Sequence, residues 1–294
     1  MTHPGTVPTV TEHTIERPDG RTVAVAESGD PDGPVVVVAH AAPGSRLLDP
    51  DPAATRAAGV RLISVDRPGY GRSTAIAAGT APTIPSHADD LAAALEALDV
   101  AEAAAVGWSA GGRIALALAA RHPGLVRAVA VVATPAPHED VPWIPDEHVA
   151  MIGQLAGDPG GATAALSDVF ADMAAMPPAA AVAMVAAGAA DEAALAADPS
   201  RRARLEAMLA EATAQGPVGM AADIVSYTMV PWDFDPASVR VPTTAVYGAA
   251  DEIVTPAHGE WYTAQVPGST LRVVAGAGHL VALTAWADVL AAVA

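Results

Sequence analysis

The run Pro34–Ala39 (PVVVVA) contains four consecutive valines and no charged side chain. A continuous β-branched run of this length is typical of a strand that is buried on both faces of a parallel sheet. Further strand-like runs follow at 60–65, 103–106, 127–133, 243–247 and 270–275. Because helical segments separate several of these runs, the order of elements predicts an α/β fold with a doubly wound, mostly parallel sheet.

Local signals indicate the elements around these runs. Residues 12–28 alternate in character around the turn at Pro18–Gly20, a pattern that predicts a β-hairpin. Residues 87–98 are expected to form a helix with Ser86 as its N-cap. A second helix is expected over residues 110–121.

The region from 136 to 237 differs from the rest of the chain. It has no strand-like runs and is rich in alanine, methionine and helix breakers. We therefore expect a helical insertion between two strands, with residues 1–135 and 238–294 forming the core. The longest uncharged stretch, between Asp172 and Asp191, is mostly alanine, which is too weakly apolar to drive membrane insertion. It is expected to form a buried or half-buried helix.

The composition excludes several kinds of partner and chemistry. The formal net charge of −18 argues against nucleic acid or an anionic membrane as a partner. The chain has no cysteine and no lysine, so disulfides, thiolate nucleophiles and Schiff-base lysines are excluded. The first 13 residues lack the apolar run of a secretory signal peptide, so a cytoplasmic protein is expected. The oligomeric state is left open between monomer and homodimer.

The segment Gly107–Gly111 has the pattern G-x-S-x-G, with Ser109 at its centre. It lies between the strand expected at 103–106 and the helix expected at 110–121. At such a tight turn the residues two before and two after the serine come close together, so both have to be small. The turn exposes the serine hydroxyl, which indicates a nucleophile. The alternative is a glycine-rich turn whose serine only caps the helix.

A serine hydroxyl needs a general base before it can act as a nucleophile. His279 lies in a glycine-containing loop just after the strand expected at 270–275, where open α/β sheets place their ligands. An imidazole ordinarily titrates near neutrality and can accept the serine proton. Among the other histidines, His258 is the main rival, because it follows the strand at 243–247.

The base needs a carboxylate that orients it. Asp251 lies just past the strand expected at 243–247 and is the favoured residue. Its alternative role is that of a turn-forming aspartate, which is common. Glu252 is a rival because it is adjacent, and Glu139 or Asp140 are rivals because they lie near the end of the preceding strand.

The negatively charged oxygen of a tetrahedral intermediate needs hydrogen-bond donors. The amide of Ala110, right after the nucleophile and at a helix N-terminus, is one candidate. The loop 40–45 follows the first buried strand and is expected to supply the other donor. Pro43 has no N–H, so Ala42 is the expected residue. His40 is expected to brace this loop.

Four segments of the chain resemble motifs of the α/β-hydrolase superfamily. The segments are 40–45 (HAAPGS), 66–73 (DRPGYGRS), 107–112 (GWSAGG) and 278–279 (GH). They resemble the oxyanion loop, the Asp-x-Pro-Gly-x-Gly-x-Ser loop, the nucleophile elbow and the histidine loop of that family. The resemblance covers about residues 20–135 and 238–294. Ala41 stands where the family usually has glycine. The serine at the elbow distinguishes the chain from haloalkane dehalogenases and epoxide hydrolases, which use aspartate there.

The resemblance implies a catalytic triad in the family's order, Ser109, Asp251 and His279. It also implies that residues 136–237 form a cap, or lid, over the site. Most of the methionines and aromatic residues of this region are expected to be flexible core filler. The alternative is that they line an adaptable apolar pocket for an acyl or aromatic group. The candidate substrate contacts are Trp108, Trp143 and Trp232.

These residues predict a serine hydrolase that needs no cofactor or metal. It is expected to cleave a carboxylic ester of a small, largely apolar molecule through an acyl-enzyme. A lactonase, an amidase, a thioesterase or a carbon–carbon bond hydrolase would use the same triad. A non-catalytic ligand-binding protein on the same scaffold is the alternative from another class of function.

Overall fold

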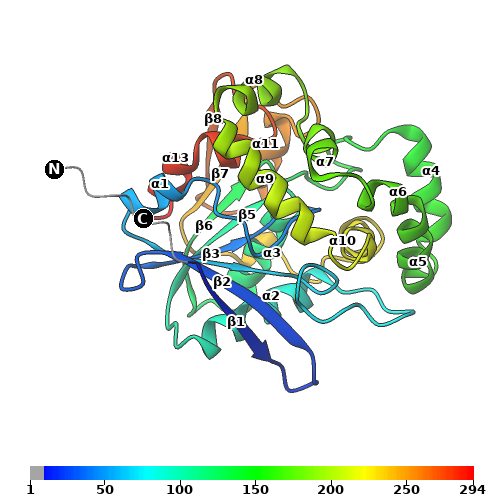
Figure 1. The fold of residues 1–294 in the computed structure, drawn as a ribbon, viewed down its shortest axis with the longest axis horizontal. Helices are drawn as coiled ribbons and strands as arrows, with labels where there is room; N and C mark the ends of the chain where they lie inside the picture. The colour runs from blue at the N-terminus through cyan, green and yellow to red at the C-terminus, as the bar shows by residue number, and fades with distance from the viewer. Residues whose placement is uncertain (1–9) are drawn as a thin grey trace.

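The computed structural model describes residues 10–294. Residues 1–9 lie outside the described residues. They include most of the N-terminal segment in which no signal peptide is expected. Within the described part, the strands form one eight-stranded sheet in the order β1-β2-β4-β3-β5-β6-β7-β8 (Figure 1). The strands are β1 (Thr11–Glu16), β2 (Thr22–Gly29), β3 (Val35–Ala39), β4 (Arg61–Val65), β5 (Ala103–Trp108), β6 (Val126–Val132), β7 (Thr243–Gly248) and β8 (Thr270–Val274).

The pairing of the strands confirms the predicted fold class. β1 and β2 form the expected antiparallel hairpin, and β2 also pairs antiparallel with β4. The pairs that join β4, β3, β5, β6, β7 and β8 are parallel. The carboxyl ends of β3, β5, β7 and β8 therefore lie at one edge of the sheet, which is where open parallel sheets bind ligands.

The side chains of the central strands alternate between two hydrophobic cores on opposite faces of the sheet. Val37 of β3 packs into one core, whereas Val36 and Val38 pack into the other. The first core is covered by α2 (Ile84–Ala97), α3 (Gly111–Arg121) and α11 (Pro256–Gln265). The second is covered by α1 (Pro52–Ala57), α12 (Val281–Thr284) and α13 (Trp286–Ala291). All three valines are at most 1% exposed, as expected for a strand covered on both faces.

The start of α2 differs from the prediction. The helix begins at Ile84, and its N-cap is Thr83 rather than Ser86. The Thr83 hydroxyl accepts from the Ser86 amide at 3.2 Å, and the Ser86 hydroxyl accepts from the Thr83 amide at 2.9 Å. This reciprocal pair is a capping box, and Pro85 is tolerated because it lies in the first turn, where no intrahelical donor is needed.

Seven helices separate β6 from β7 (Figure 1). They are α4 (Asp146–Leu155), α5 (Pro159–Val169), α6 (Ala171–Ala174), α7 (Pro178–Val185), α8 (Ala189–Ala197), α9 (Pro199–Ala212) and α10 (Val218–Thr228). A short 3₁₀ helix, η1 (Pro236–Ser238), precedes β7.

The prediction of one buried or half-buried helix between Asp172 and Asp191 is wrong. This stretch contributes to three short helices, and most of its side chains are exposed or half-buried. Pro177 and Pro178 end the first helix and begin the second, because proline cannot continue a helix that precedes it. Gly188, at φ 101°, separates the second helix from the third.

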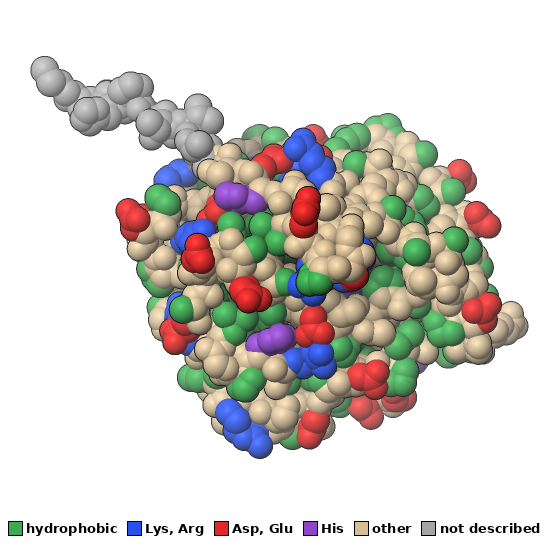
Figure 2. Space-filling model, turned by 90° about the horizontal axis from the view of Figure 1, so that it is seen from below, with side chains coloured by type: hydrophobic (Ala, Val, Ile, Leu, Met, Phe, Trp, Pro, Cys, Tyr) green, Lys and Arg blue, Asp and Glu red, His purple; other side chains and the backbone are tan. Residues whose placement is uncertain are grey.

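The acidic side chains do not gather into one patch on the face shown in Figure 2, where they are scattered among hydrophobic, basic and neutral groups. Over residues 10–294, no helix has both the length and the hydropathy that crossing a bilayer requires.

Candidate active site

Ser109 lies at the turn between β5 and α3, with a left-handed backbone conformation (φ 53°). This conformation is uncommon outside glycine and is typical of a strained, functionally constrained turn. The Ser109 amide donates to the carbonyl of Val132 on the neighbouring strand at 2.8 Å, which ties the turn to β6. The expected nucleophile elbow is therefore present as a structural feature.

Glycine is required on both sides of the serine by close backbone contacts. A Cβ atom at Gly107 would lie 2.2 Å from the carbonyl oxygen of Gly111, and one at Gly111 would lie 2.0 Å from that of Ala39. Both distances are far below van der Waals contact, and both neighbouring atoms belong to the backbone. The G-x-S-x-G spacing thus follows from the packing of the turn against β3 and α3.

The structure brings Ser109, His279 and Asp251 together, although they come from distant parts of the chain. His279 Nε2 lies 3.3 Å from the Ser109 hydroxyl oxygen, and His279 Nδ1 lies 2.8 Å from Asp251 Oδ2. The carboxylate can only accept, so Nδ1 carries the proton and Nε2 is free to accept the hydroxyl proton. This is the polarity that a serine nucleophile requires.

Asp251 is itself held rigidly. It is 3% exposed, and its Oδ1 atom accepts from the amides of Ile253 at 3.0 Å and Val254 at 2.8 Å. The aspartate turn that was expected as the alternative role of Asp251 is thus also present. Oδ1 serves this turn, while Oδ2 remains available to the imidazole of His279.

The rival residues lie elsewhere. His258 is buried, its Nδ1 atom accepts from the Ala136 amide at 3.0 Å, and burial lowers its pKa to about 4. Asp140 accepts from the indole of Trp261 at 2.9 Å, and Glu252 is exposed. None of these three forms a hydrogen bond with His279 among the described residues.

The expected oxyanion donors lie beside the serine. Ala42 and Ser109 line the same cavity, and Ala110 immediately precedes the first residue of α3. Within residues 10–294, neither the Ala42 nor the Ala110 amide has a hydrogen-bond acceptor, so both are free to bind an anionic oxygen. Ala41, where the family usually has glycine, is 7% exposed and forms part of the cavity wall.

His40 and Arg67 hold the backbone next to Ala42. The His40 ring donates from Nδ1 to the Ala41 carbonyl at 2.7 Å, and its Nε2 atom lies 3.4 Å from the Arg67 amide. Arg67 donates from Nη1 to the His40 carbonyl at 2.7 Å and from Nη2 to the Ala41 carbonyl at 3.0 Å. Burial and the nearby guanidinium hold the pKa of His40 well below its usual value, so the ring is a neutral brace.

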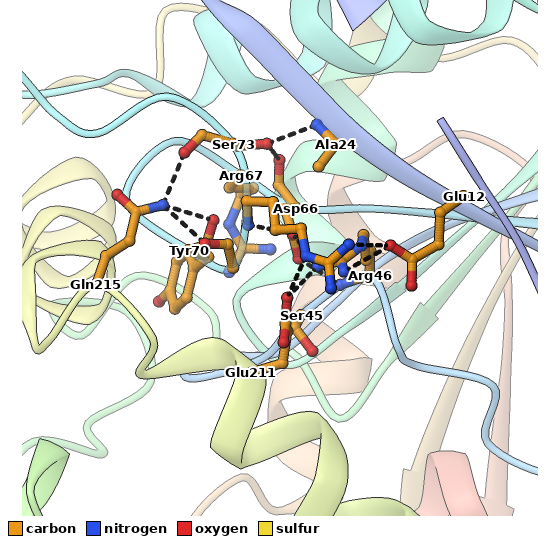
Figure 3. Close-up of polar contacts among 12 residues, drawn as sticks. Glu12, Ala24, Ser45, Arg46, Asp66, Arg67, Tyr70, Ser73, Glu211 and Gln215 are labelled. Atoms are coloured by element: carbon orange, nitrogen blue, oxygen red, sulfur yellow. Dashed lines mark hydrogen bonds and ion pairs between the residues drawn. The ribbon is translucent and has the colours of Figure 1, made fainter. Parts of the chain in front are cut away.

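Charged side chains fix the loop 66–73 against its neighbours (Figure 3). The buried carboxylate of Asp66 accepts from the Arg46 amide at 2.5 Å, from Arg46 Nη1 at 2.8 Å and from the Arg72 amide at 2.9 Å. Arg46 also reaches Glu12 of β1 at 2.9 Å, and it pairs with Glu211 of α9. Asp66 therefore anchors its own loop through the guanidinium of Arg46, which also contacts Glu211 of the insertion.

Gln215, which follows α9 in the insertion, makes a second connection to this loop (Figure 3). Its amide nitrogen lies within hydrogen-bond distance of three loop carbonyls, those of Tyr70 at 3.1 Å, Gly71 at 3.0 Å and Ser73 at 2.7 Å. The insertion is therefore joined to the core by polar contacts as well as by apolar packing.

A cavity of about 270 Å³ opens at the serine, and its lining is almost wholly apolar. Its polar side chains are Ser109, His279 and Thr213. The insertion supplies much of the wall, including Phe170, Met173, Met184, Met208 and Met220. Trp108 lines the cavity and also donates from its indole to the His279 carbonyl at 3.1 Å, so it both borders the site and supports the histidine loop.

The expectation that Trp143 and Trp232 line the same cavity is wrong. They border a separate cavity of about 490 Å³, where Arg113 also lies. Trp143 donates to the Ala136 carbonyl at 3.1 Å, and the guanidinium carbon of Arg113 lies 5.1 Å from the centre of the Trp232 ring. Both tryptophans lie near the ends of the insertion, so they pack where it joins the core rather than over the serine.

A family model described as the alpha/beta hydrolase fold matches residues 34–285. The chain belongs to the α/β-hydrolase family. The matched residues contain Ser109, Asp251 and His279 and the whole helical insertion. In the described part of this α/β-hydrolase, no group of three or more histidines and carboxylates is placed to hold a metal ion.

Known proteins similar to this α/β-hydrolase include two curated relatives and an esterase of known structure. It is 31% identical over 283 residues to the polyketide synthase ThaQ of Burkholderia thailandensis, covering 94% of this chain and 12% of that protein. It is 35% identical over 88 residues to the probable oxidoreductase EphD of Mycobacterium tuberculosis, covering 30% of this chain and 15% of that protein. The chain thus spans only a small part of either relative. A thermophilic esterase from Thermogutta terrifontis has the same fold, with a TM-score of 0.69 and 22% identity over 97% of this chain and 96% of that chain.

Two acidic residues of the α/β-hydrolase site were not expected from the sequence. Asp191 of α8 accepts hydrogen bonds from the histidine loop, and Asp223 of α10 pairs with Arg67. Both lie in alanine-rich helical segments with no motif around them. Their partners are far away in the chain, so only the tertiary structure reveals them.

Proposed function

We propose that this α/β-hydrolase cleaves carboxylic esters of small, largely apolar molecules through an acyl-enzyme. Membership of the family supports a hydrolase. The observation that carries the ester proposal is the polar chain from Ser109 through His279 to Asp251, which meets an apolar cavity at the serine. A nucleophile, a base and an orienting carboxylate in hydrogen-bond sequence are the parts that acyl transfer needs.

Acylation begins when the Ser109 oxygen attacks the ester carbonyl carbon and His279 Nε2 takes the hydroxyl proton. The amides of Ala42 and Ala110 donate to the oxyanion that forms. The imidazolium, stabilised by Asp251, then gives its proton to the leaving alkoxide oxygen as the ester C–O bond breaks. The separation of 3.3 Å between His279 Nε2 and the serine oxygen shortens when substrate binds, as is common at such sites.

Deacylation repeats these roles with water as the nucleophile. His279 takes a proton from water, the resulting hydroxide attacks the acyl carbon, and the imidazolium returns the proton to the Ser109 oxygen. The acid is released and the free serine is restored. These steps use only side chains and amides of this chain and one water molecule, so the proposed reaction needs no cofactor.

The cavity argues for an apolar acyl or alcohol group. Burial of apolar surface contributes about 25 cal/mol per Å², whereas an ionised group would be desolvated there without a partner. No arginine lines this cavity within the described residues, so it offers no cation for a carboxylate or phosphate. We further propose that residues 136–237 act as a cap that sets the size and shape of the acceptable substrate.

The test compares the unaltered protein with Ser109→Ala on p-nitrophenyl esters from acetyl to dodecanoyl, beside lactones and anilides. We expect ester turnover with a preference for apolar acyl groups. Loss of the nucleophile should reduce kcat by roughly 10³-fold or more, with little change in thermal unfolding. A fluorophosphonate probe should label the unaltered protein at Ser109. Full ester turnover by Ser109→Ala, or absence of labelling, would overturn the proposal.

Acyl thioesters are the second candidate substrate. The thioesterase alternative considered from the sequence is kept because nearly the whole chain is similar to a segment of a polyketide synthase. The same triad would transfer the acyl group, with a thiolate as the leaving group. Steady-state kinetics on acyl thioesters and oxygen esters of the same acyl chain length decide between the two candidate substrates. A kcat/KM at least about tenfold higher for the thioesters would favour this second candidate, since the acyl contacts are shared.

A further inference from the structure

Asp191 lies in α8 of the insertion and binds the backbone of the histidine loop. Its Oδ2 atom accepts from the His279 amide at 3.0 Å, and its Oδ1 atom accepts from the Leu280 amide at 3.0 Å. Oδ2 also accepts from the Ala187 amide at 2.9 Å. Two of these three bonds therefore cross from the insertion to the loop that carries the proposed base.

The environment of Asp191 is unusual for a carboxylate. The residue is 1% exposed, and no arginine or histidine side chain within residues 10–294 forms an ion pair with it. A buried carboxylate without a cation is stabilised chiefly by hydrogen bonds to its charged form. Burial raises the pKa of Asp191, whereas the three amides and the nearby His279 ring oppose that rise.

Gly278 shows that the loop is shaped to receive this carboxylate. A Cβ atom at position 278 would lie 2.4 Å from Asp191 Oδ1, well inside van der Waals contact. Any larger residue at this position would push the carboxylate away from the amides of His279 and Leu280. The Gly278–His279 pair of the histidine loop is thus matched to an acidic partner about 90 residues earlier in the chain.

A local capping role does not account for these contacts. Asp158 and Asp198 cap α5 and α9, and their side-chain contacts are made only with residues of their own helices. Asp191 instead lies inside α8 and makes one local bond, to Ala187, while each of its oxygen atoms accepts from the histidine loop. Its contacts are those of a link between two parts of the fold.

We propose that Asp191 is a positioning residue, which holds the imidazole of His279 in register with Ser109 and couples the insertion to the proposed triad. This inference rests on the proposed function. Fixing the amides at 279 and 280 fixes the direction of the His279 side chain, and small misplacements of a base are costly in rate. The negative charge also favours the imidazolium that forms when Ser109 gives up its proton. Asp251 orients the ring through Nδ1, and Asp191 acts on the backbone behind it.

The main variant is Asp191→Asn, which keeps the size of the side chain but removes its charge and one acceptor. We expect kcat/KM for esters to fall about 10- to 100-fold, chiefly through kcat, because the cavity itself is unchanged. Hydrogen exchange of the His279 and Leu280 amides, followed by NMR, should become about tenfold faster, because both amides lose their charged acceptor. A purely structural role would lower thermal stability without lowering kcat.

Asp158→Asn is the matched control, because Asp158 makes the same kind of bond only within α5. It should leave both readouts unchanged. Gly278→Ala is the second variant, because its added methyl group displaces the Asp191 carboxylate without altering it. It should also lower kcat, so it tests the inference even where Asp191→Asn does not fold. The inference is overturned if Asp191→Asn folds with kcat/KM within twofold of the unaltered protein and unchanged hydrogen exchange of the His279 and Leu280 amides. If the unaltered protein neither turns over esters nor reacts with a fluorophosphonate, the proposed function fails, whereas exchange of these two amides still reports on Asp191.

Discussion

The guanidinium of Arg67 and the carboxylate of Asp223 form a buried ion pair between the core and the insertion. Arg67 Nε lies 3.1 Å from Asp223 Oδ1, and Arg67 Nη2 donates to Asp223 Oδ2. Both side chains are at most 3% exposed. Tyr70 donates its hydroxyl to the same carboxylate at 2.7 Å. Because Arg67 also holds the backbone carbonyl of Ala41, this pair connects α10 to the loop expected to bind the oxyanion.

Removal of one partner of this pair should destabilise the fold strongly. Asp223→Ala leaves the guanidinium of Arg67 buried without a counter-charge, and we expect the free energy of unfolding to fall by about 3–5 kcal/mol. Urea unfolding measures the change. The exposed pair of Arg272 and Asp288, each about half exposed, is the control, and Asp288→Ala should change stability by less than about 1 kcal/mol. Equal effects of the two substitutions would contradict the assigned role of the buried pair.

Replacement of Asp251 by asparagine should abolish most activity while preserving the fold. The carboxamide oxygen introduced by Asp251→Asn can still accept from Ile253 and Val254, but the NH₂ group donates to His279 Nδ1 and selects the wrong tautomer. Nε2 would then carry the proton and could not accept from Ser109, so we expect kcat to fall by roughly 10⁴-fold near neutral pH. Steady-state kinetics measure this. Glu252 is the exposed neighbour, and Glu252→Gln should retain near-normal kcat. A large loss for Glu252→Gln with near-normal kcat for Asp251→Asn would identify Glu252 as the acid instead.

Enlargement of the cavity should shift the preferred acyl length. Met208 is 2% exposed and lines the cavity at the serine, so Met208→Ala should favour longer acyl chains over acetyl. The buried volume that is lost should also lower stability by about 2–5 kcal/mol. Met176→Ala is the matched control, because Met176 is 39% exposed and lies outside the cavity lining. An unchanged chain-length profile for Met208→Ala would indicate that the acyl group binds elsewhere.

Acid should destabilise the fold through His87. Burial lowers the pKa of His87 to about 4, and its ring lies 3.7 Å from Asp223 Oδ1. The unfolded ring protonates below its ordinary pKa of about 6.5, so between these two pKa values the unfolded state binds more protons, and stability decreases as the pH is lowered. From pH 7 to 5 this group alone should remove about 2 kcal/mol. His87→Asn should show a correspondingly smaller decline in urea unfolding, whereas the exposed His148→Asn should match the unaltered protein.

The elements near the serine could be predicted because their signals are local. Four consecutive valines need burial on both faces, and glycines at 107 and 111 are the residues that a turn this tight accepts. The positions of His279 and Asp251 followed from parallel strands ending at one sheet edge. The helical insertion was predicted as a region, but its breaks at Pro177 and Gly188 were missed.

The sequence by itself determined the order of the core strands, the serine turn and the loops that follow the strands, because each depends on backbone geometry over a few residues. Only the tertiary structure decided which insertion residues reach the site. Asp191 and Asp223 meet partners about 90 and 156 residues away in the chain, whereas Trp143 and Trp232 pack at a different cavity. Such contacts depend on how the insertion helices sit against the sheet, and that placement results from the sum of many weak packing interactions that no short motif encodes.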